Sequence, residues 1–108
     1  MIPQVKAAEV AAWLKDGNRD SPLLVDVREP WEYAICHIDG SRLIPLQTLP
    51  TRLSDLPKDR DLVLVCRSGH RSQTAAEWLA RNGFPRVHNL SGGVRAWSSD
   101  VDPTMPKY

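Results

Sequence analysis

Hydrophobic residues along the chain gather in four short runs, and each run ends at a charge, a proline or a polar turn. Uninterrupted apolar runs of this length predict strands that are buried on both faces of a sheet. The four predicted strands lie within PLLVDVREP (22–30), RLIPL (42–46), DLVLVC (61–66) and RVHNL (86–90).

Segments with helical spacing lie between these runs. In VKAAEVAAWLKDGN (5–18), Val10, Trp13 and Leu14 share one helix face, and the helix is expected to end near Gly17. Shorter helices are predicted within 30–41, with Pro30 in the first turn, over about 72–82, before the stop signal Gly83, and within 92–100. The proline-broken segment 47–61 is expected to form at best two helical turns on the surface.

Short apolar strands that alternate with helices pair in parallel through right-handed crossovers. The pattern therefore predicts an α/β fold with three layers. In such sheets ligands bind outside the carboxyl ends of the strands. We expect the functional residues to follow the strands at that edge.

Composition changes this picture little. With 108 residues, 42% of them hydrophobic and 25% charged, the chain is expected to form one globular domain over 1–108. A net charge of +1 and the lack of a long apolar run argue against nucleic-acid or membrane partners. The first ten residues do not resemble a signal peptide, and two cysteines do not make a disulfide scaffold, so a cytoplasmic location with a free thiol is expected.

Cys66 occupies the most informative position in the chain, because it stands where a buried strand ends and a loop leads into a helix. Such loops bind anions through unpaired N–H groups and the positive end of the helix. No Asp or Glu occurs between Leu62 and Ala76, so the neighbouring groups should stabilise a thiolate. The pattern predicts a nucleophilic cysteine that acts on an anionic substrate. The predicted substrate-binding residues are Arg67, Ser68, Gly69, His70 and Arg71.

Three other interpretations of the loop are weaker. A lone cysteine is often an inert buried residue, but here two arginines, a glycine and a helix follow it. A phosphate-binding P-loop would need more glycines and a lysine. A zinc site lacks paired ligands at chelating spacing, and no metal is expected; the residues available for one would be Cys36, His37, Cys66, His70 and His88.

Three segments, in this order and spacing, resemble single-domain rhodaneses along almost the whole chain: LLVDVREPWEYAICHIDGSRLIP (23–45), VLVCRSGHRS (63–72) and NLSGGVRAW (89–97). The resemblance implies a five-stranded parallel sheet flanked by helices. It also implies a thiosulfate sulfurtransferase in which Cys66 alternates between thiolate and persulfide, without a cofactor. Thiosulfate would be the donor, and cyanide or a thiol such as thioredoxin or glutathione the acceptor. Arg67 and Arg71 would orient the donor, and Ser68 would add a hydroxyl group.

Two alternatives to this function stay open. Phosphatases on the same fold resemble this loop but have five residues between Cys and Arg, whereas four separate Cys66 from Arg71. The shorter loop suits one sulfur atom better than a phosphate. The other alternative is a sulfur-carrier or interaction module with little turnover of small molecules.

The resemblance gives other residues supporting roles. Asp26 and Arg28 would form a structural ion pair that braces the active-site loop, and Gly92 and Gly93 would allow close backbone approach. Cys36 replaces the glycine usual in the family, so it is either an inert buried thiol or a resolving thiol for Cys66. The four tryptophans are expected mainly in the core, although Trp31 and Trp97 could rim the pocket.

Overall fold

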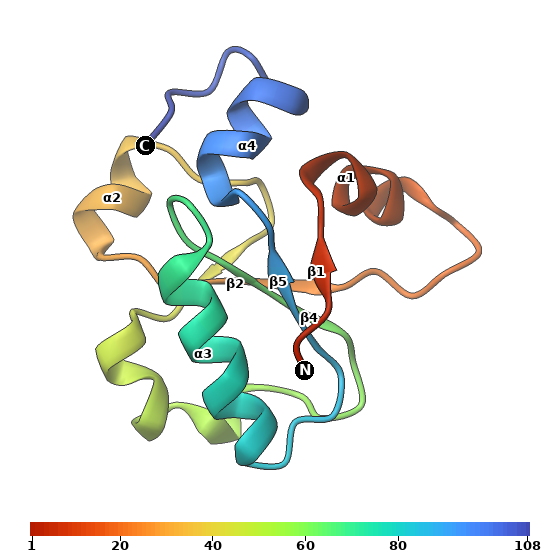
Figure 1. Ribbon diagram of the computed structural model, residues 1–108, viewed down its shortest axis with the longest axis vertical. Coiled ribbons are helices and arrows are strands. Elements are labelled where there is room, and N and C mark those ends of the chain that lie inside the picture. Colours follow the sequence, from red (N-terminus) through yellow and green to blue (C-terminus); the bar gives the residue numbers. More distant parts are fainter.

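Five strands form one parallel sheet in the computed structural model, which describes all residues from 1 to 108 (Figure 1). Their order across the sheet is β1-β5-β4-β2-β3, and every neighbouring pair is parallel. The strands are β1 (Gln4–Val5), β2 (Leu23–Asp26), β3 (Arg42–Leu43), β4 (Leu62–Val65) and β5 (Val87–Leu90). The predicted α/β class and the five-stranded parallel sheet are confirmed.

The two strands at the centre of the sheet are buried at every position. β2 pairs with β4 from Leu23 opposite Leu62 to Asp26 opposite Val65. Side chains alternate between the two faces of a strand, so an apolar run without polar positions fits a strand covered on both sides. The apolar runs at 22–30 and 61–66 thus form the interior strands β2 and β4, whereas the run at 42–46 forms the edge strand β3.

Helices cover both faces of this sheet. They are α1 (Ala7–Lys15), α2 (Pro30–Ile35), α3 (His70–Arg81) and α4 (Gly93–Asp100), with 3-10 helices over Leu46–Thr51 and Leu53–Asp55. One apolar cluster joins the sheet to α3, and a second joins it to α1 and α4. The three predicted layers are therefore present. No helix combines the length and the hydrophobicity that crossing a membrane requires.

Two features differ from the sequence prediction. β1 has only two residues, Gln4 and Val5, and the apolar pattern gave no sign of it. α3 begins at His70, two residues before the predicted start, because Gly69 takes a left-handed conformation (φ 107°) at the N-cap and turns the chain directly into the helix.

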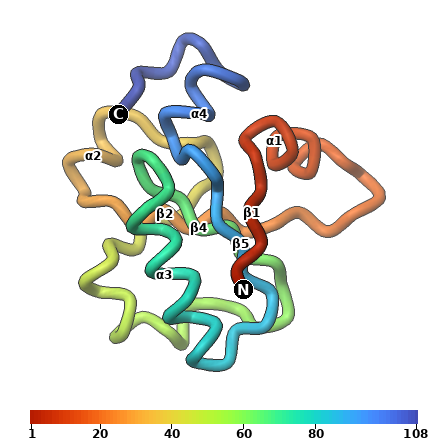
Figure 2. Tube along the Cα trace, viewed as in Figure 1, coloured from red at the N-terminus to blue at the C-terminus, as the bar shows by residue number.

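The last residues return toward the middle of the chain. After α4 the chain crosses back and ends beside α2, next to the loop between β4 and α3 (Figure 2). This segment, residues 102–108, is called the C-terminal strap below. It brings residues far apart in the sequence to the carboxyl edge of the sheet.

Candidate active site

Cys66 directly follows β4 at the carboxyl edge of the sheet, where the strand order predicts a ligand site. Its side chain continues the alternation of β4 and belongs to the cluster on the α3 side, with 1% of the residue exposed. The loop from Cys66 to Gly69 then leads into α3. Of the residues 67–71 singled out in the sequence, Arg67, Ser68 and Gly69 form this loop, and His70 and Arg71 open α3.

Two polar groups contact the thiol. The N–H of Gly69 donates to Sγ of Cys66 at 3.0 Å, and the hydroxyl of Ser72 lies 3.2 Å from the same sulfur. Other N–H groups of the loop and the first turn of α3, from Arg67, Ser68, His70 and Arg71, have no protein acceptor. Unpaired N–H groups at a helix N-terminus favour a negatively charged species.

The Ser72 hydroxyl is part of a short chain of hydrogen bonds. It lies 2.5 Å from Oδ1 of Asn89, whose amide nitrogen donates to Gln4 and to the carbonyl of Gly69. Because these contacts fix the amide, Oδ1 is the acceptor and the Ser72 hydroxyl donates to it while the thiol is protonated. When the thiol ionises, rotation of the hydroxyl can direct its proton to sulfur. Ser72 and Asn89 were not singled out in the sequence, because only the fold brings them to the thiol.

The turn before α4 packs against the backbone of Cys66 and Arg67. The N–H groups of Val94 and Arg95 donate to the carbonyls of Cys66 and Arg67, at 2.9 and 3.1 Å. A Cβ atom at Gly93 would overlap the Cys66 carbonyl and lie 2.6 Å from the carbonyl carbon of Arg67. The close backbone approach predicted for this glycine pair is confirmed at Gly93.

Arg71 is held by an acidic residue from another element. Its guanidinium donates to both carboxylate oxygens of Glu32 on α2, at 2.7 and 2.8 Å. The hydrogen bonds from Arg71 lower the pKa of Glu32, against the opposing effect of burial. The pKa of Arg71 is raised, chiefly by its hydrogen bonds to Glu32 and against the opposing effect of burial. The sequence around Cys66 contains no acid, but the fold brings one to the loop.

Arg67 is in a different environment. The residue is exposed, and its guanidinium makes no hydrogen bond or ion pair. It lies over the ring of Tyr108, 4.5 Å from the centroid. Ser68 on the loop and His70 at the start of α3 are both exposed, and their side chains lie 3.4 Å from each other. Arg67 is thus the arginine of this loop whose donors are free.

Asp26 and Arg28 form an ion pair with no exposed side-chain surface. Burial acts to lower the pKa of Arg28, and its hydrogen bonds and charge interaction with Asp26 outweigh that effect and raise it. Arg28 also donates to the carbonyl of Cys36 at 2.7 Å and to the backbone oxygen of Tyr108 at 3.2 Å. The pair therefore holds the end of α2 and the C-terminal strap, and Asp26 lies opposite Val65, the residue before Cys66.

Cys36 and Cys66 lie on opposite sides of the sheet. Cys36 belongs to the apolar cluster on the α1 and α4 side, and its thiol donates to the carbonyl of Pro106 at 3.3 Å. Both thiols are free and buried. This placement favours the inert, packed thiol over the resolving thiol among the two roles considered for Cys36.

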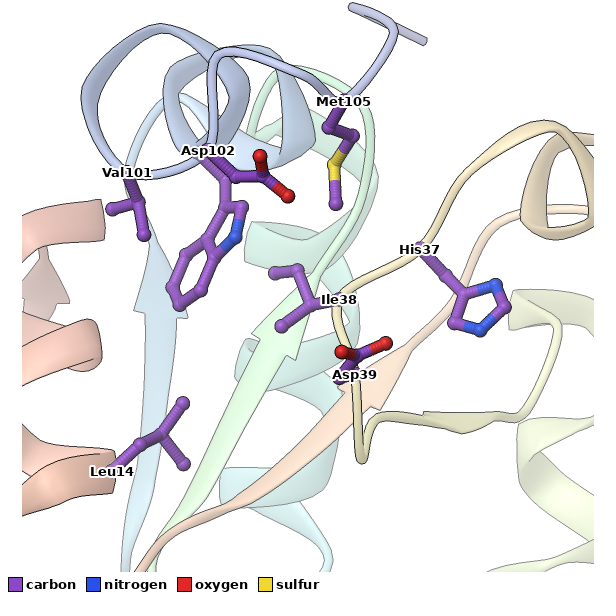
Figure 3. A pocket seen from close by; sticks show the side chains of 8 residues that line it. Leu14, His37, Ile38, Asp39, Val101, Asp102 and Met105 are labelled. Atoms are coloured by element: carbon purple, nitrogen blue, oxygen red, sulfur yellow. The ribbon is translucent and has the colours of Figure 1, made fainter.

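The cavities of the structure lie elsewhere. One pocket of about 270 Å³ is lined by residues of α1, α4, the C-terminal strap and residues 37–39 (Figure 3). Trp97 lines this cavity rather than the Cys66 loop, and Asp39 and Asp102 give it the wrong charge for an anionic donor. No cavity is lined by residues 66–71. Trp31, also considered for the pocket rim, is 56% exposed on α2.

Comparison with known proteins gives concordant results. A family profile described as Rhodanese-like domain matches residues 6–100. An Allochromatium vinosum protein described as a sulfurtransferase is 40% identical over 98 residues, which cover 91% of this chain and 90% of that protein. The thiosulfate sulfurtransferase GlpE of Stutzerimonas stutzeri is 39% identical over 84 residues, which cover 74% of this chain and 77% of that protein.

Some relatives are longer. The Mycobacterium tuberculosis protein MoeZ, described as a probable adenylyltransferase/sulfurtransferase, is 39% identical over 102 residues. These residues cover 93% of this chain and 26% of that protein. Among solved structures, a rhodanese-like domain protein from Staphylococcus aureus is 30% identical, covers 97% of both chains and has a TM-score of 0.84.

Proposed function

The chain belongs to the rhodanese-like domain family, whose members similar to it include sulfurtransferases, and on this premise we propose that Cys66 carries sulfur from thiosulfate to a thiol or to cyanide. The observation that carries the proposal is the environment of Cys66 Sγ. The sulfur accepts an N–H from Gly69 inside a loop of unpaired N–H groups, and the arginine with free donors follows it directly.

The first step transfers the outer sulfur of thiosulfate. The Cys66 thiolate attacks that sulfur and forms a new S–S bond, and the S–S bond of thiosulfate breaks with its electron pair leaving on sulfite. The product is a Cys66 persulfide with a negative outer sulfur. Preorganised N–H donors stabilise such a charge without a general base. Arg67 offers its free donors to the sulfonate oxygens of the incoming donor.

The second step returns the enzyme to its starting state. Cyanide attacks the outer sulfur of the persulfide, and the S–S bond breaks with its electrons returning to Cys66 Sγ; the products are thiocyanate and the thiolate. A thiolate acceptor reacts in the same way and leaves as a persulfide.

Intact-mass spectrometry after treatment with thiosulfate tests the proposal. The wild type and Cys36→Ser should each gain one sulfur atom, which cyanide or dithiothreitol removes, while Cys66→Ser should gain none. Thiocyanate production measures turnover in the same samples. An adduct without turnover would identify a sulfur carrier in place of the enzyme, and an adduct that persists in Cys66→Ser would refute the assignment.

A parallel assay separates the phosphatase alternative. With four residues between Cys66 and Arg71, and with Arg71 engaged by Glu32, the loop is not arranged to surround a phosphate with this arginine. We expect no measurable hydrolysis of aryl phosphates by protein that forms the persulfide. Robust hydrolysis would replace sulfur transfer as the function.

A further inference from the structure

Arg67 depends on a residue that comes last in the chain. Its guanidinium makes no hydrogen bond or ion pair. Its Cζ atom lies over the Tyr108 ring, 4.5 Å from the ring centroid. An aromatic face attracts the flat side of a guanidinium and leaves the N–H donors along its edge free. Such a contact restrains a flexible side chain without occupying the groups that would bind an anion.

Tyr108 is itself held from two directions. The Trp31 ring packs edge-on against it, with centroids 5.3 Å apart, and the fully buried Arg28 donates to its backbone oxygen at 3.2 Å. Aromatic pairs with this geometry and separation are favourable. The hydroxyl of Tyr108 makes no hydrogen bond, so the ring is the part that acts on Arg67.

The C-terminal strap is fixed at further points before it reaches this position. Ser98 donates its hydroxyl to the carbonyl of Met105 at 2.5 Å, and Cys36 donates its thiol to the carbonyl of Pro106 at 3.3 Å. The strap thereby runs from α4 across to α2, where the chain ends (Figure 1), and the Tyr108 ring contacts Arg67 of the cysteine loop. Trp31, Tyr108 and Arg67 come from three separate segments, and the Tyr108 ring contacts both of the others: Trp31 edge-on and Arg67 over its face.

We propose that Tyr108 is a positioning residue for sulfur transfer: its ring holds the Arg67 guanidinium beside the Cys66 loop, with its edge donors directed to the anionic donor. The proposal rests on the proposed function and deepens it. It explains how an arginine without any hydrogen bond keeps a defined place on an exposed loop. It also gives Trp31, which is 56% exposed, a role as support for Tyr108.

Kinetics of five variants test the coupling. Tyr108→Leu should raise the KM for thiosulfate about two- to fivefold with kcat nearly unchanged, which matches an exposed cation–π contact. Tyr108→Phe keeps the ring and should behave as the wild type. Lys107→Ala is the matched control on the strap and should also behave as the wild type. In Arg67→Ala, addition of Tyr108→Leu should raise the KM no further.

Several outcomes would overturn the positioning role. They are a fall in kcat at unchanged KM in Tyr108→Leu, a KM in Tyr108→Phe as high as in Tyr108→Leu, and additive effects of the Arg67 and Tyr108 substitutions. The first and third outcomes would mean that Tyr108 affects the structure in general and not Arg67 in particular. The second would mean that Tyr108 acts through its hydroxyl group.

NMR separates this proposal from the proposed function. The δ-methylene protons of Arg67 should show an upfield ring-current shift in the wild type and in Tyr108→Phe, and the shift should disappear in Tyr108→Leu. Thiosulfate binding to Cys66→Ser, measured by amide shifts, should weaken two- to fivefold on adding Tyr108→Leu. If the wild type does not turn over thiosulfate but these two results hold, the sulfur donor is wrong and the positioning role stands. Absence of the ring-current shift, or unchanged binding, would refute the positioning role itself.

Discussion

Arg67 and Arg71 have the same side chain and lie four residues apart, yet their surroundings differ. Arg71 donates to both oxygens of Glu32 and is thereby tied to α2. Arg67 faces a ring and keeps its donors free. A guanidinium that is already engaged by a carboxylate contributes its charge and holds the loop, whereas a free one can bind the oxygens of the substrate.

Replacement of Arg67 by alanine should therefore affect substrate binding more than chemistry. We expect Arg67→Ala to raise the KM for thiosulfate about tenfold, with kcat within about twofold, because a charge contact to the distal sulfonate acts alike in ground and transition states. Steady-state thiocyanate formation measures both constants. A large fall in kcat at an unchanged KM would contradict this assignment.

Ser72 offers a test at the sulfur itself. Ser72→Ala removes the hydroxyl that lies 3.2 Å from Sγ of Cys66 and leaves Oδ1 of Asn89 without that donor. We expect persulfide formation to slow about tenfold and the free energy of unfolding to fall by about 1 to 2 kcal/mol. Thr74→Ala, on the exposed side of the same helix, is the control and should leave both unchanged. Persulfide formation at the wild-type rate in Ser72→Ala would exclude the hydroxyl as a donor to the thiolate.

The sequence placed Cys66 between a strand end and a helix start, and the structure has both, because these signals are contiguous. Residues 66–71 carry their own evidence: a strand end, positive charges and a helix start. Glu32, Ser72 and Asn89 were missed, because a carboxylate, a hydroxyl and an amide have no distinctive pattern until the fold brings them together. Tyr108 was missed for the same reason.

At the scale of elements, the loop after β4 and the turn before α4 fit together through backbone atoms. Val94 and Arg95 donate to the two carbonyls that follow Val65, and Gly93 has no side chain to obstruct them. The cysteine loop therefore depends on a helix that begins 27 residues later, counting from Cys66 to Gly93.

Two glycine substitutions separate backbone strain from this contact. Gly93→Ala places a methyl group against the Cys66–Arg67 backbone and puts alanine at a positive φ of 58°. We therefore expect the unfolding free energy to fall by about 2 to 5 kcal/mol and nearly all activity to be lost. Gly40 has φ 82° but open space around it, so Gly40→Ala should cost about 1 to 2 kcal/mol and keep activity. Urea unfolding and thiocyanate assays give both quantities. Equal effects of the two substitutions would mean that the contact with the loop is unimportant.

Uninterrupted apolar runs predicted the interior strands, whereas the sequence predicted the short edge strand β1 and the first residue of α3 less well. β2 and β4 were evident because every residue is buried. β1 has two residues and owes its strand geometry to pairing with β5, which no local pattern reveals. The start of α3 depends on the conformation of Gly69, and the sequence shows the glycine without its dihedral angles.

Across the whole molecule, two carboxylates with lowered pKa values lie at opposite ends of the sheet. Glu32 is held by Arg71 near the carboxyl ends of the strands. Asp61 precedes β4 at the other end; burial acts to raise its pKa, and hydrogen bonds from Arg86 and contact with His88 outweigh that effect and lower it. Both groups connect separate elements, but only Glu32 contacts a residue of the cysteine loop.

These pKa shifts predict the acid sensitivity of the fold. A carboxylate whose pKa is lower in the folded state stabilises that state fully above its ordinary pKa, and the contribution is lost as the pH falls through the folded value. We therefore expect the free energy of unfolding in urea to fall as the pH decreases from about 5 toward 3. Glu32→Gln and Asp61→Asn should each be less stable than the wild type at neutral pH and show a smaller further loss in acid.

Activity at neutral pH then distinguishes the two carboxylates. Glu32→Gln should lower the unfolding free energy by about 1 to 2 kcal/mol, which is the value of a charged hydrogen-bonded pair reduced for the partial exposure of Arg71. It should also lower thiosulfate turnover, because Arg71 beside the cysteine loop is then no longer tied to α2 by an ion pair. Asp61→Asn removes a brace remote from Cys66 and should leave kcat and KM unchanged in the folded protein. Equal losses of turnover in both variants would show that activity follows overall stability. Normal turnover in Glu32→Gln would show that the loop keeps its geometry without the ion pair to α2.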